Sequence, residues 1–138
     1  MNYDELKRKY GRKVRQKPRH IESEIQSACV EWFRREYPRY VIFSVPNGGS
    51  RNVIEAAHLR KEGALAGVSD LIILADGRVL FVEMKSGKGR QTRLQRAFQE
   101  RVESQGFTYA VCRSLLEFAA AFVHWLKDND KATKNKDL

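Results

Sequence analysis

Two carboxylates and a lysine fall at the ends of a predicted β-hairpin. Asp70 begins the apolar run DLIIL, and Glu83 and Lys85 lie near the end of RVLFVEMK. The Asp76-Gly77 pair between these runs is typical of a tight hairpin turn, and counting outward from it places Asp70 across from Glu83. Alternate residues of a strand face the same side, so Glu83 and Lys85 share a side. We therefore expect two acids and an ammonium group to converge at one edge of the hairpin.

This constellation has a chemical and a structural interpretation. Nearby carboxylates repel each other unless a cation lies between them, and Mg²⁺ binds through one or two carboxylates together with water and phosphate oxygens. Metal-bound water is a stronger nucleophile toward a phosphodiester, and Lys85 would orient that water, help to deprotonate it or stabilise charge on the phosphorus. The structural alternative is an acid at a strand entrance, an exposed Glu83 and an edge lysine that opposes aggregation.

The loop after the second strand favours the chemical interpretation. Its sequence, SGKGRQ, is rich in glycine and carries Lys88 and Arg90 just before a predicted helix. Helix N-termini bind anions, so Lys88 and Arg90 are candidate contacts for a nucleic-acid phosphate. The alternative is a flexible connection with solvated charges.

A third carboxylate comes from the first long helix. Its apolar stripe centres near Ile25 and Ala28, which places Glu22 nearer the core than Glu24. A partly inward glutamate is costly unless it is paired, so Glu22 is a candidate metal ligand. Both glutamates also suit the positive end of a helix dipole, and the sequence leaves the two interpretations open.

Apolar periodicity predicts an α/β fold in which helices flank a central mixed β-sheet. The expected order is helix, strand, helix, strand, strand, helix, strand, helix. The elements are a helix from Ile21 that ends before Pro38, a strand at 40–45, a short helix at 52–62, strands at 70–74 and 78–85, a helix at 92–104, a strand at 107–112 and a helix at 114–127.

Composition predicts one basic domain with flexible ends. The chain has 138 residues, a formal net charge of +9 and a pI near 9.8, which suggests a nucleic-acid partner, with an anionic membrane surface as the rival. We expect a basic arm over 1–19, a folded domain over 20–127 and a fraying polar tail over 128–138. No stretch resembles a spanning helix or a signal peptide, so a cytoplasmic protein is expected. Cys29 and Cys112 lie among apolar neighbours, which indicates burial rather than a zinc site.

These motifs together resemble the VRR-NUC (virus-type replication-repair nuclease) domain, a branch of the PD-(D/E)xK nuclease superfamily. The resemblance runs from about Ile21 to Phe122 and includes ESEIQ, VPNGGSRN, GVSD, EMK and GKGRQ. It implies a restriction-endonuclease-like core, with Asp70, Glu83, the Met84 carbonyl and Glu22 as metal ligands. It further implies that Lys85 is catalytic, that Gln95 lines the site, and that nucleic acid is approached by a loop containing Asn47, Gly48, Gly49 and Arg51. Ser69 stands where family members commonly have proline.

The resemblance implies a DNA endonuclease that depends on Mg²⁺, with Mn²⁺ able to substitute. Small stand-alone members resemble phage-encoded enzymes that act as homodimers on branched DNA such as Holliday junctions, in a bacterium or a phage-infected cell. The last helix, which is apolar on two sides, would supply core and a dimer contact. Two alternatives stay open: a nucleic-acid-binding module that does not cleave, and a restriction-type enzyme that cuts duplex DNA.

Overall fold

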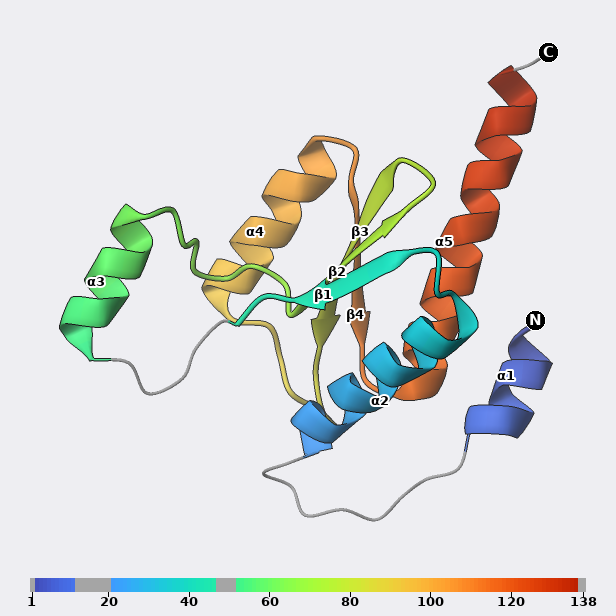
Figure 1. Ribbon diagram of the computed structural model, residues 1–138, viewed down its shortest axis with the longest axis horizontal. Coiled ribbons are helices and arrows are strands. Elements are labelled where there is room, and N and C mark those ends of the chain that lie inside the picture. Colours follow the sequence, from blue (N-terminus) through green and yellow to red (C-terminus); the bar gives the residue numbers. More distant parts are fainter. Residues whose placement is uncertain (1, 12–20, 47–51, 137–138) are drawn as a thin grey trace.

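A mixed four-stranded β-sheet forms the centre of the molecule, with helices on both faces (Figure 1). The computed structural model describes residues 2–11, 21–46 and 52–136. Strand order is β1-β2-β3-β4, antiparallel except for the parallel β3–β4 pair, which confirms the predicted α/β class. The elements are α1 (Tyr3–Tyr10), α2 (Ile21–Glu36), β1 (Val41–Ser44), α3 (Val53–Lys61), β2 (Leu71–Ala75), β3 (Arg78–Met84), α4 (Arg93–Ser104), β4 (Thr108–Cys112) and α5 (Leu115–Lys136).

The β2–β3 hairpin turns at the predicted pair. Asp76 and Gly77 both have positive φ, 50° and 75°, the pattern of a type I′ turn. Tyr40 braces the turn, because its hydroxyl donates a 2.9 Å hydrogen bond to Asp76 Oδ2. The register pairs Leu71 with Val82, so the next residues outward are Asp70 and Glu83. The turn therefore sets which acid lies opposite which.

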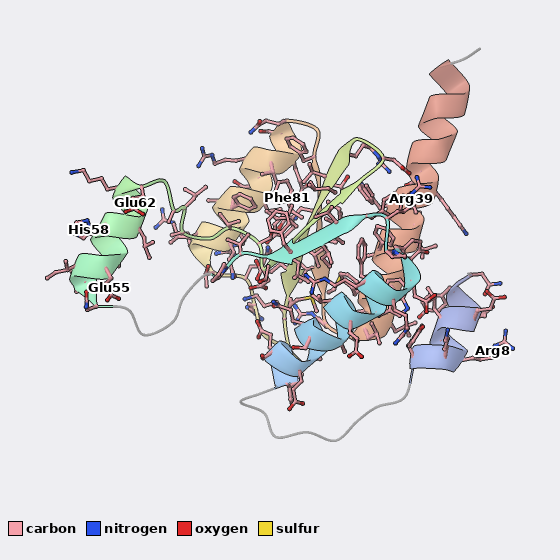
Figure 2. The ribbon with its side chains drawn as sticks, in the orientation of Figure 1. Arg8, Arg39, Glu55, His58, Glu62 and Phe81 are labelled. Atoms are coloured by element: carbon pink, nitrogen blue, oxygen red, sulfur yellow. The ribbon has the colours of Figure 1, made fainter. Side chains whose placement is uncertain are left out.

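The two faces of the sheet are covered differently. On one face, α2 and α5 pack over buried strand residues such as Ile73 and Leu80, and Phe33 and Phe122 meet edge to face 4.9 Å apart. On the other face, α4 covers β3 and β4, and Phe81 lies between sheet and helix (Figure 2) with its ring 5.3 Å from that of Phe98. Glu83 belongs to this second face.

Residues 3–10 of the expected basic arm form a helix rather than a flexible segment. These residues form α1, which packs against α5, and Leu6 is only 1% exposed. The Asn2 and Glu5 side chains cap the helix start, and Lys9 lies 3.7 Å from Glu36 of α2. One buried leucine and the Tyr10 ring anchor this short, charged helix, whereas the sequence suggested too few apolar groups to do so. The rest of the expected arm, 12–19, lies outside the described residues.

The expected polar tail over 128–138 is also corrected in part. The last helix does not end at 127 but continues to Lys136. No glycine or proline follows Leu115 to stop the helix. His124 and Asp128 are one turn apart, and His124 Nε2 lies 3.3 Å from Asp128 Oδ2.

Cys29 and Cys112 are free and buried as predicted, and burial raises the pKa of each thiol to about 12. Neither thiol is therefore poised as a thiolate.

Candidate active site

Asp70 and Glu83 lie side by side where β2 begins and β3 ends. Asp70 Oδ2 accepts a 2.8 Å hydrogen bond from the Met84 backbone N–H, which fixes the carboxylate against β3. The Asp70 carbonyl also accepts a bond from Val45 N at 2.9 Å, so its backbone is held by the neighbouring chain. The predicted meeting of these two acids is therefore confirmed by the backbone register and by contact.

Glu83 is the buried member of the pair, with 1% of its surface exposed. Each carboxylate oxygen accepts one hydrogen bond from a neutral side chain. Gln95 Nε2 of α4 donates to Oε1 at 3.2 Å, and the Tyr109 hydroxyl of β4 donates to Oε2 at 2.9 Å. Two elements that follow β3 in the chain thus fix the orientation of this carboxylate.

The environment of Glu83 favours its neutral form. Burial, and next the Asp70 carboxyl beside it, raise the pKa of Glu83 to about 8 from an ordinary value of 4.5. The Tyr109 hydrogen bond and the Lys85 charge oppose this shift. Burial and the Glu83 charge in turn raise the pKa of Tyr109, so the phenol stays protonated and acts as a donor. At neutral pH, a cation would relieve the cost of two ionised acids here.

The donor set fits a hard divalent cation. Oxygen ligands from two adjacent acids are what Mg²⁺ uses, with water and phosphate oxygens completing its coordination. Among the described residues, no three His, Cys, Asp or Glu side chains gather closely enough to hold a metal ion by themselves.

Lys85 follows the end of β3 on the same side as Glu83. It is half-buried, and its charge acts directly on the Glu83 carboxyl. Its backbone N–H donates to the Cys112 carbonyl at 3.0 Å, which extends the β3–β4 pairing past the last strand residue. Met84, between the two, buries its side chain in the opposite core and leaves only its backbone toward the site. The expected alternation of faces is confirmed.

Glu22 is not brought into this group. It lies exposed in the first turn of α2, as does Glu24, while Gln26 one turn on is half-buried. Its predicted role as a metal ligand stays a prediction. Asn47, Gly48, Gly49 and Arg51, the predicted nucleic-acid loop, lie outside the described residues.

The start of α4 is fitted tightly against the loop before Asp70. Gly67 has φ +89°, and a Cβ there would stand 2.5 Å from the Leu94 carbonyl oxygen. Thr92 caps the helix in a capping box with Gln95, whose Oε1 accepts from Thr92 N at 2.8 Å. Gln95 therefore caps its own helix with one atom and binds Glu83 with another. Gln95 thus lies beside Glu83, and its role at the site stays a prediction.

Ser69 compensates locally for the missing proline. It is fully buried, and its Oγ donates to the Leu71 carbonyl at 3.2 Å. This bond spans Asp70 and helps to fix the backbone that carries it.

Tyr109 and Gln91 are site residues that sequence reasoning missed. Gln91 Nε2 donates to the Tyr109 hydroxyl at 3.3 Å and to Gln99 Oε1 at 3.0 Å. Since the hydroxyl accepts from Gln91, its single proton is directed to Glu83. Strand alternation put Tyr109 on one face of its strand, but only the parallel pairing with β3 shows that this face carries Glu83.

The two predicted phosphate contacts lie in the β3–α4 loop. Lys88 and Arg90 are both exposed there. Arg113, which follows β4, donates from Nη1 to the Gly87 carbonyl at 2.8 Å and so ties this loop to the sheet.

Across the described ranges, no helix is both long and apolar enough to span a membrane.

Comparison with known proteins finds similarity to one domain family. The sequence model of the VRR-NUC domain family matches residues 20–115 of the chain. A solved "VRR_NUC domain protein" is 23% identical with a TM-score of 0.59, and the match covers 81% of this chain and 89% of that chain. A second solved "VRR_NUC domain" is 21% identical with a TM-score of 0.56, covering 76% and 97%. No curated protein matches the chain significantly. At these identities the two structures support the fold.

Proposed function

Because the chain belongs to the VRR-NUC domain family, which has a nuclease fold, we propose that it is a metal-dependent DNA endonuclease that hydrolyses phosphodiester bonds. The observation that carries this proposal is the pairing of Asp70 with the buried Glu83, with Lys85 alongside. A buried acid beside another acid destabilises the metal-free protein, and such costs are tolerated where chemistry needs them.

The proposed cofactor is Mg²⁺, with Mn²⁺ able to substitute. Asp70 and Glu83 would hold it, together with the Met84 carbonyl and, as a prediction from the resemblance, Glu22. When bound, the ion supplies positive charge that stabilises the phosphate under attack and lowers the pKa of water.

The protein's own side chains would position the metal ligand and the DNA strand, and would offset negative charge on the phosphate. Tyr109 and Gln95 hold Glu83 in one orientation beside Asp70. Lys85 contributes an ammonium group that would orient the attacking water or stabilise charge on the phosphorus. Phosphate contacts from Lys88 and Arg90 would fix the strand without reading its sequence.

The proposed substrate is branched DNA, such as a Holliday junction, and the proposed assembly is a homodimer. A net charge of +9 supports affinity for DNA that depends on phosphates rather than bases. Shape would then select the substrate, and a dimer would present two sites to a branched molecule. Sedimentation equilibrium tests the dimer, since the monomer has a mass of 16.0 kDa.

The test is cleavage of end-labelled four-way, flap, splayed and linear DNAs with Mg²⁺ or Mn²⁺. Asp70→Asn, Glu83→Gln and Lys85→Met are each expected to lower the cleavage rate by at least about a hundredfold, while DNA binding persists. Asp76→Asn is the matched control, because it removes a carboxylate from the other end of the same hairpin and Asn tolerates its positive φ. Retained cutting by any of the three variants, or DNA binding by the wild type without any metal-dependent product, contradicts the proposal.

A further inference from the structure

An arginine-lined hollow opens beside the candidate active site. It has a volume of about 390 Å³ and lies between the β3–α4 loop, α4 and the turn from β4 into α5. Its lining residues are Arg90, Gln91, Arg96, Val111, Arg113 and Glu117. Arg96 has no part in the site described above, and Arg113 entered it only through its bond to the Gly87 carbonyl.

The positive charge of the hollow is only partly offset by the described protein, because three arginines share its wall with one acid. None of the three guanidinium groups forms an ion pair with an acid of the described residues. Glu117, the acid in the wall, lies in the first turn of α5 and accepts a hydrogen bond from the Arg113 backbone N–H. Its negative charge also interacts favourably with the positive end of the helix dipole. Gathering three like charges around one cavity is unfavourable unless an anion offsets them.

Two residues of the hollow, Arg113 and Gln91, are held in place before any ligand binds. Arg113 is half-buried, and its bond to the Gly87 carbonyl fixes the guanidinium at 2.8 Å from the loop. Gln91 is held between Gln99 and Tyr109. A guanidinium that is already oriented loses less side-chain entropy on binding an oxyanion, and its planar N–H groups match two phosphate oxygens.

The hollow is close enough to Glu83 to act on the same DNA strand. Val111, which lines the hollow, is paired with Glu83 across the parallel β3–β4 ladder, and both side chains face the same side of the sheet. Adjacent strands are about 4.8 Å apart, so the hollow begins one strand away from the buried acid. That separation suits a phosphate near the one being cut.

We propose that this hollow binds a phosphodiester group of the cleaved strand, flanking the phosphate that is hydrolysed. The proposal rests on the proposed nuclease function and adds a subsite to it. Arg96 and Arg113 contact the flanking phosphate, and Arg90 joins them from the loop. The subsite fixes the strand so that the next phosphate reaches Asp70 and Glu83.

The test measures DNA binding in EDTA, where cleavage does not interfere. Fluorescence anisotropy compares the wild type with Arg96→Gln and with Arg101→Gln. Arg101 lies on the same helix, about 140° around its axis from Arg96, and is the matched control. We expect Arg96→Gln to weaken binding about fivefold and to lower the slope of log K against log salt by about 0.9, against less than about half of either change for Arg101→Gln. Equal effects of the two variants would overturn the subsite.

A methylphosphonate scan locates the phosphate. Replacing one charged phosphate at a time along the strand should weaken wild-type binding at a position next to the cut, and this replacement should have little further effect on Arg96→Gln. Additive losses at every position would refute the assignment. A wild type that fails to cleave with Mg²⁺ refutes the nuclease function instead, and this outcome is distinguishable because the binding data are metal-free.

Discussion

At the scale of single residues, the site depends on how one buried carboxylate is held. Glu83 receives one hydrogen bond on each oxygen, from Gln95 and from Tyr109. The tyrosine proton points to Glu83 because Gln91 donates to the same hydroxyl. Such outer partners orient a metal ligand and raise the affinity of the site. Under the proposed function, Tyr109 therefore positions a metal ligand without itself touching the metal or the DNA.

Removing the Tyr109 hydroxyl should weaken metal binding without unfolding the protein. Tyr109→Phe keeps the ring that packs 6.3 Å from Phe98, and we expect it to lower Mn²⁺ affinity about tenfold in titration calorimetry. Tyr40→Phe is the control, since it removes another 2.9 Å tyrosine–carboxylate bond, to Asp76 at the far end of the hairpin. A loss of affinity that is the same in both variants would count against a positioning role.

At the scale of elements, α4 is the part that completes the site. Its first turn is located by close contact between Gly67 and Leu94, by its own capping box and by the Gln95–Glu83 bond. The helix also covers Phe81 with Phe98. Any change that shifts its start moves Gln95 away from the carboxylate.

Gly67→Ala should therefore reduce both stability and cleavage. The added Cβ would meet backbone atoms of Leu94 at 2.5 and 2.6 Å, so helix or loop must move. Gly63→Ala is the control: Gly63 also has positive φ, +116°, but a Cβ there has nothing within 4 Å. We expect Gly63→Ala to cost about 1 kcal/mol in urea unfolding and to keep cleavage. Comparable losses of activity in both variants would show that the Gly67–Leu94 contact is unimportant.

The hairpin and its acids could be predicted from sequence because their determinants are local. The Asp76-Gly77 turn and the alternation of DLIIL and RVLFVEMK fixed the register without knowledge of the rest of the chain. Tyr109 could not be assigned in this way. Its contact with Glu83 depends on the parallel pairing of β3 with β4, and α4 lies between these two strands in the sequence. α1 escaped prediction because only one buried leucine, Leu6, and the Tyr10 ring anchor it. The fold was thus readable from patterns, whereas contacts between distant elements were not.

At the scale of the whole molecule, the site makes stability depend on pH. Glu83 has a pKa of about 8 in the folded protein and about 4.5 when unfolded, so the folded state binds the extra proton between these values. Stability is therefore highest, with respect to this group, below about pH 4.5 and is lost as the pH rises toward about 8. Each unit of pKa difference corresponds to about 1.4 kcal/mol.

Glu83→Gln should remove most of this dependence in the metal-free protein. Melting temperatures in EDTA are expected to fall for the wild type between about pH 5 and pH 8, and to stay nearly level for the variant. The variant should therefore be the more stable protein at alkaline pH even though it has lost a proposed ligand. Parallel curves for the two proteins would show that Glu83 does not carry the effect.

The parallel pairing of β3 with β4 orders events on the ribosome. Asp70 and Glu83 leave the exit tunnel first, whereas Gln95 and Tyr109, which hold Glu83, follow only after further synthesis. A chain that ended shortly after Lys85 would carry both acids with neither support, and it would lack α4 and α5, which cover opposite faces of the sheet. The carboxylate pair therefore gains its two supports only after α4 and β4 have been synthesised and have docked.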